Sequence, residues 1–193
     1  MLEIIQQINW LDIFIIILLF RISYIAAKTG VPVESFKLLG TVVSIYLALH
    51  YYTNLSDLLT QRASLNKERV PLEFIDFLSF VSLAAAGYLI ILSFRVAFAR
   101  FIKMEATPNL NRWLGLALGV IRGLLLVSLI TFTLAISSSG YLKKSVANSY
   151  FGRRLFNTAP EAYSWLWNKV TSKFMPSEKF NDTVSEVQKS FNL

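Results

Sequence analysis

The stretch from Trp113 to Ile136 is mostly apolar and contains a single charged residue, Arg122. A run of about 20 mostly apolar residues is long enough to cross a bilayer as a helix. An arginine at membrane depth is costly unless it reaches the surface or finds a partner. Since lipid cannot hydrogen-bond an exposed backbone, such a segment restricts the chain to very few folds. We therefore expect a membrane protein.

The composition of the whole chain supports this expectation. Of the 193 residues, 54% are hydrophobic and 16% are charged, whereas soluble domains have roughly 25% charged residues. Four segments approach the length of a spanning helix, namely residues 9–27, 36–52, 74–98 and 113–136. The sequence therefore predicts an all-α integral membrane four-helix bundle over residues 1–140, followed by an amphipathic helical C-terminal tail over residues 141–193.

The first segment is the least apolar of the four, because Asp12 and Arg21 lie within it. The residues before it include Glu3 and no Lys or Arg, and no small-residue cleavage site follows. A signal peptide would need basic residues before the apolar segment and a small-residue cleavage site after it. We expect a helix that is retained.

The connections between the segments differ in kind. Gly30 and Pro32 indicate a tight turn, so the first two helices should be antiparallel neighbours. The link over residues 53–73 places leucines among polar residues, and it is either an amphipathic helix on the membrane surface or a solvated loop. Asn109 or Asn111 is expected to cap the fourth helix.

The formal net charge is +7, but Lys and Arg fall mostly at the predicted helix ends. Positive charge there sets the orientation of the helices and meets anionic lipid headgroups. Without a basic soluble domain, we expect the lipid bilayer and no nucleic acid as partner. The two short connections carry a modest excess of Lys and Arg, which places them in the cytoplasm and both termini outside it.

Arg122 shares one helical face with Gly115, Gly119 and Gly123. At about 100° per residue, these four residues lie on one stripe of the helix. Glycines four residues apart allow another helix to approach closely. The stripe therefore predicts either close packing within the chain or a self-association surface that would make a homo-oligomer.

Asp12 and Asp76 are the candidate partners of Arg122, and each lies near the start of a predicted span. Both belong to the end away from the short connections, which disfavours a direct ion pair with Arg122. Two interpretations stay open. Arg122 reaches lipid phosphates, or the three residues form a polar site in the membrane. The carboxylates could instead meet each other, or Lys143 and Lys144.

Apolar residues return at helical spacing after the last span. One run follows Pro160 and another follows Pro176, so the tail should form two short amphipathic helices. These helices would bind the membrane interface, which we favour, pack under the bundle, or recognise a partner. Trp10 and Trp113 begin their spans, as interfacial anchors do, although simple packing would give the same pattern.

Residues 9–12 are Asn-Trp-Leu-Asp, and residues 110–125 contain Leu-Asn-Arg-x-x-Gly followed by Leu-Gly-x-x-Arg-Gly-Leu-Leu. These motifs resemble the bacterial colicin V production protein family, and the resemblance extends over residues 9–165. Two features depart from the family pattern. Asn111 stands where the family often has Asp, and the turn at residues 29–32 replaces a basic one.

The resemblance implies a bacterial inner-membrane protein that is needed for colicin V production or export and has a wider role in the envelope. We expect an accessory scaffold that recruits envelope or export proteins through its tail. The alternative is an oligomeric channel or small transporter whose polar path includes Arg122, Asp12 and Asp76.

No pattern in the sequence indicates catalysis. Cysteine is absent, and the single histidine, His50, ends the second predicted span. Hydrolase and phosphate-binding motifs are missing, and Asp76 lacks the neighbouring glycines of an intramembrane aspartyl protease. We expect a non-enzymatic protein with no catalytic residue, no metal and no cofactor.

Overall fold

The structure is a computed structural model that describes residues 9–62, 70–98 and 108–191, and within these ranges the chain is all-helical. The described part has three helices that are long and apolar enough to cross a membrane. They are α2 (Trp10–Arg62), α3 (Leu72–Phe98) and α4 (Pro108–Ile136). α2 contains the first two predicted segments as two helical halves that meet at a kink.

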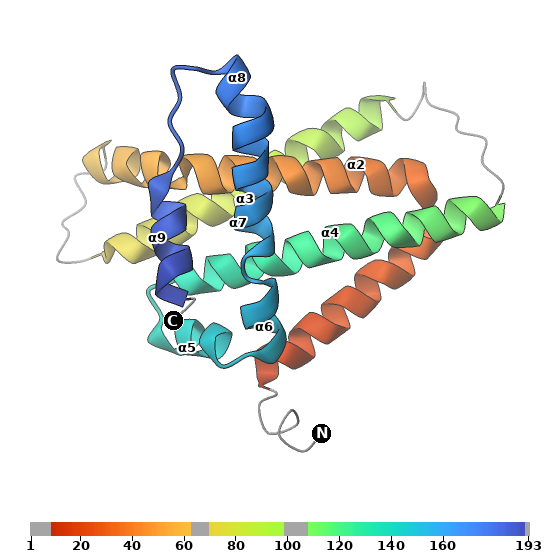
Figure 1. The fold of residues 1–193 in the computed structure, drawn as a ribbon, viewed down its shortest axis with the longest axis horizontal. Coiled ribbons are helices and arrows are strands. Elements are labelled where there is room, and N and C mark those ends of the chain that lie inside the picture. Colours follow the sequence, from red (N-terminus) through yellow and green to blue (C-terminus); the bar gives the residue numbers. More distant parts are fainter. Residues whose placement is uncertain (1–8, 63–69, 99–107, 192–193) are drawn as a thin grey trace.

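α2 is bent at the position where the sequence predicts a turn. Gly30 has a φ of 76°, a left-handed conformation that glycine adopts without a steric penalty. Pro32 follows, and its missing N–H weakens the helix at the same place. Figure 1 shows the two halves of α2 opening from this bend, with α4 between them in that view.

Two predicted boundaries differ from the structure. α2 continues to Arg62, so the start of the 53–73 link is helical and extends the second half of α2. α4 begins at Pro108, so the prediction that Asn109 or Asn111 caps it is wrong. Proline is itself favoured in the first turn of a helix. The rest of the 53–73 link up to residue 69, like Glu3, lies outside the described residues.

α3 packs along the second half of α2, whereas α4 contacts both halves. Small residues allow the close approach of α3, since a Cβ added to Gly87 would lie 2.9 Å from the Cα of Ser44. Three aromatic rings then connect α3, α4 and the tail. Phe132 stacks against Phe80 at 5.5 Å and against Phe156 at 5.6 Å between ring centroids.

The tail consists of short helices, which are α5 (Gly140–Ala147), α6 (Tyr150–Leu155), α7 (Thr158–Leu166), the π-helix η1 (Trp167–Thr171), α8 (Ser172–Phe174) and α9 (Asp182–Phe191). Figure 1 shows α7 crossing the long helices steeply. Val146, Tyr163 and Val184 are fully buried and belong to the same core as residues of α2, α3 and α4. Part of the apolar surface of the tail is thus packed on the long helices, whereas Trp165, Val170 and Phe174 stay exposed. Binding of the tail to the membrane interface stays a prediction.

Candidate polar site in the membrane helices

Arg122 lies against Glu34, a carboxylate that was not among its expected partners. Nη2 of Arg122 is 3.0 Å from Oε2 of Glu34. Glu34 is fully buried and Arg122 is 6% exposed. Helical side chains tilt toward the N-terminus of their helix, so Arg122 reaches back along α4 toward the bend of α2, where Glu34 closely follows Pro32.

The other oxygen of Glu34 accepts two hydrogen bonds. Oγ1 of Thr29 and Nζ of Lys37 each donate to Oε1 at 2.7 Å. One buried carboxylate thus faces two basic side chains, and this pairing offsets much of the penalty for removing the charges from water. Nε of Arg122 has no hydrogen-bond partner among the described residues. The contact between Nη2 of Arg122 and Oε2 of Glu34 is an ion pair without hydrogen-bond geometry.

The glycine stripe of α4 packs against the first half of α2. A Cβ added to Gly115 would lie 2.8 Å from the carbonyl oxygen of Ala26, and one added to Gly119 would overlap the Cβ of Ala26. A Cβ on Gly123 would lie 3.0 Å from Cδ2 of Leu19. These contacts are within the chain, which was the first of the two alternatives for this face. Formation of a homo-oligomer stays a prediction.

Asn111 stabilises the bend of α2. Its Oδ1 accepts a hydrogen bond from the backbone N–H of Val31 at 2.7 Å, where the left-handed Gly30 interrupts the regular hydrogen bonding of the helix. A side chain on Gly30 would overlap the side chain of Asn111. An aspartate at this position would offer the same acceptor oxygen, so the departure from the family motif preserves the contact.

Asp12 lies away from Arg122 and binds the tail. Its Oδ1 accepts hydrogen bonds from Oγ of Ser149 at 2.6 Å and from the backbone N–H of Phe151 at 2.9 Å. Its Oδ2 accepts from the backbone N–H of Tyr150 at 3.3 Å. The fully buried carboxylate thereby satisfies free N–H groups in the first turn of α6, where negative charge is favourable.

Asp76 lies in a third place, partly buried on α3 beside Ser56 of α2. Lys143 pairs with Glu73 at 3.3 Å. Within the described ranges, no hydrogen bond or ion pair joins Arg122, Asp12 and Asp76. The structure therefore distributes the expected polar site over three locations.

His50 connects α2 to the tail. Its Nδ1 lies 2.8 Å from Oη of Tyr163, and its Nε2 lies 3.2 Å from Oε2 of Glu178. The ring stacks on Trp167 at 5.2 Å. The hydroxyl of Tyr163 is protonated at neutral pH and can donate a hydrogen bond to His50, and burial raises its pKa further, to about 12.

Glu34 and the contact of His50 were the main features missed from the sequence. One signal could have identified Glu34, because it is a carboxylate in the short connection toward which the side chain of Arg122 tilts. Nothing comparable marks His50, whose hydrogen-bond partners Tyr163 and Glu178 come from the tail. In the part of the chain that the structure describes, no group of three or more His, Asp or Glu residues is placed to hold a metal ion.

Comparison with known proteins gives one informative result. Neither a curated protein nor a solved structure matches the chain. The family model described as colicin V production protein matches residues 11–160, which include almost all of α2, the whole of α3 and α4, and the first part of the tail. Since this match covers well over half of the sequence, the chain belongs to the colicin V production protein family.

Proposed function

We propose that this protein is a non-catalytic accessory scaffold of the bacterial inner membrane that supports colicin V production or export and envelope function. Family membership supports the link to toxin production. The observation that carries the scaffold role is that the two most deeply buried charges of the long helices have partners within the chain. Arg122 pairs with Glu34, and Asp12 binds the start of α6. Charges used in this way hold helices together.

In this proposal the two halves of α2 are two spans, and α3 and α4 add one each, which makes a four-helix bundle. The bend at Gly30 then lies in the cytoplasm and both termini lie outside it. Exposed apolar side chains along all three long helices, such as Phe20, Leu89 and Val120, support a lipid-facing surface. The exposed parts of the tail are the surface that would recruit envelope or export proteins.

Single-cysteine labelling tests this topology, because the chain has no cysteine of its own. Lys28 and Asp57 are exposed on the two halves of α2. We expect a membrane-impermeant maleimide to label Asp57→Cys in cells whose inner membrane is intact. Lys28→Cys should react only after that membrane is opened. Labelling of both positions from the same side would contradict four spans, and the reversed pattern would invert the orientation.

A complementation assay tests the scaffold role. In a strain that lacks the protein, toxin secretion is measured with the double variant Glu34→Gln/Arg122→Gln, which removes both charges and keeps groups that can hydrogen-bond. We expect secretion close to that of the wild type. Gly119→Leu is the comparison that disrupts helix packing, and it should reduce the amount of protein in the membrane.

The alternative, an oligomeric channel or small transporter, predicts a different result in the same assay. A polar path through Arg122 would lose its charge in the double variant. Lost secretion with a normal amount of membrane protein would therefore reject the scaffold and favour the path. The unpartnered Nε of Arg122 is the observation that keeps this alternative worth testing.

A further inference from the structure

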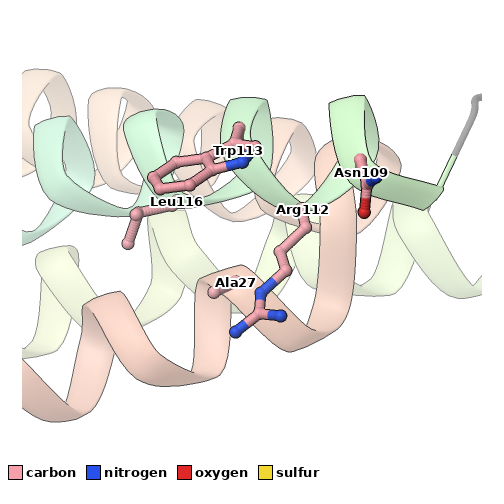
Figure 2. Close-up of a pocket in the computed structure, with 5 residues that line it drawn as sticks. All are labelled: Ala27, Asn109, Arg112, Trp113 and Leu116. Carbon is pink, nitrogen blue, oxygen red and sulfur yellow. The ribbon is translucent and has the colours of Figure 1, made fainter.

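A pocket of about 250 Å³ opens beside the bend of α2, between its first half and the start of α4. It is lined by Ala27, Asn109, Arg112, Trp113 and Leu116. Figure 2 shows the side chain of Arg112 extending from α4 toward Ala27 on α2, with Trp113 and Leu116 on one side of it and Asn109 on the other. The lining thus combines the polar side chains of Arg112 and Asn109 with the apolar surface of Trp113 and Leu116.

We propose that this pocket binds an anionic phospholipid, with the phosphate on Arg112 and the start of an acyl chain along Trp113 and Leu116. Arg112 is exposed, and among the residues that the structure describes it has no hydrogen bond or ion pair. Its planar guanidinium can donate two parallel hydrogen bonds to one phosphate group. Asn109 lines the same pocket, and its amide can also donate a hydrogen bond.

The surroundings of the pocket favour a lipid over a free phosphate ion. Trp113 is 70% exposed, and Leu110 and Leu114 are exposed beside it on α4. This apolar surface would face acyl chains, and tryptophan is enriched at the depth of the headgroups. A free phosphate has no apolar part that could use Trp113 and Leu116, whereas a phospholipid can contact both the polar and the apolar side chains of the lining.

The charges near the pocket are complementary to an anionic headgroup. Lys28 directly follows Ala27 and is exposed, with its ammonium 4.3 Å from the ring centroid of Tyr24. The nearby Glu34 is buried, and its oxygens already face Lys37 and Arg122. This carboxylate therefore offers little competition for Arg112. The proposal requires only that α2 and α4 lie in a membrane, so it is independent of the scaffold role.

Native mass spectrometry of the full chain tests the proposal. The protein is released from vesicles of equal parts phosphatidylglycerol and phosphatidylcholine, and the retained lipids are counted. We expect the wild type to retain phosphatidylglycerol preferentially. Arg112→Gln should weaken its binding about fivefold, as expected for one basic residue near a membrane surface. Arg21→Gln, which removes an exposed arginine of α2 outside the pocket lining, is the matched control and should leave binding unchanged.

Several outcomes would overturn the proposal. Equal retention of the two lipids by the wild type would do so, and this comparison needs no variant to fold. An unchanged affinity in Arg112→Gln would also reject the site. Displacement of the bound lipid by millimolar inorganic phosphate would reassign the pocket to a free phosphate. As a second readout, brominated phosphatidylglycerol should quench tryptophan fluorescence more than brominated phosphatidylcholine does, and Trp113→Phe should remove that difference.

Discussion

At the scale of single residues, Glu34 is the most consequential side chain in the long helices. It is fully buried and faces Arg122 at 3.0 Å and Lys37 at 2.7 Å. The three charges are not equivalent. Without Arg122, Glu34 still has Lys37 and Thr29 as partners. Without Glu34, two basic side chains face each other with no carboxylate between them, and a buried unpaired charge is strongly destabilising.

The stability of the protein should therefore respond unequally to the two halves of the ion pair. We expect Glu34→Gln to lower the free energy of unfolding by about 3–5 kcal/mol. Arg122→Gln should lower it by about 1–2 kcal/mol, because one partner of Glu34 is lost and others remain. Equilibrium unfolding in mixed micelles measures both values. Equal losses would contradict the central position of Glu34.

At the scale of elements, the fold depends on how closely α4 approaches the first half of α2. The Cβ of Ala26 occupies the space that a side chain at position 119 would need. The Cβ of Ala26 is fixed to the helix backbone and cannot move aside as a long side chain could. A further methyl group would therefore force the two helices apart. The contact has room for one methyl group.

Moving that methyl group from one helix to the other tests the packing. Gly119→Ala alone should destabilise the protein by about 1–3 kcal/mol. Adding Ala26→Gly should restore most of the loss, since the methyl group is then on α4 instead of α2. Gly140→Ala is the matched control, because a Cβ at Gly140 meets nothing within 4 Å. The same unfolding assay applies, and a double variant no better than Gly119→Ala would exclude this contact as the cause.

The long helices show what sequence can and cannot predict at this scale. Apolar length located the long helices, and Gly30 with Pro32 located the bend, because both signals are local. The length of the apolar run did not predict that α2 continues to Arg62, because a helix that extends beyond the membrane needs no apolar run. The tail periodicity identified apolar faces correctly, but periodicity does not specify which surface covers a face. The pairing of Glu34 was not predicted for a related reason, because its partner Arg122 lies on another helix.

At the scale of the whole molecule, the tail and the membrane helices form one core. Tyr163 is a central residue of this contact, because its hydroxyl meets His50 and also accepts a hydrogen bond from the backbone N–H of Asn181 at 3.1 Å. Burial is the largest cause of its raised pKa, about 12 compared with the ordinary 10.0. The docked tail therefore favours the neutral form of the Tyr163 hydroxyl.

Docking of the tail should weaken in alkaline solution. A pKa that is higher in the folded protein than in the unfolded chain means that the unfolded chain ionises first. The contribution of Tyr163 to stability is thus complete below pH 10 and declines as the pH rises from 10 to 12. Thermal unfolding followed by circular dichroism measures this decline. Tyr163→Phe should be less stable at neutral pH and should lose less stability across that interval, whereas parallel pH profiles would contradict the role of Tyr163.

The hydrogen bonds of Asp12 have a consequence for biosynthesis. The ribosome makes Asp12 at the start of α2, but Ser149, Tyr150 and Phe151, which bind its carboxylate, emerge only after α4. Until then this carboxylate lacks these partners, and burying it unpaired in the membrane would be costly. Insertion of the first helix and its final positioning are therefore separate events in time, and a chain released before residue 151 would leave the first helix inserted without its anchor.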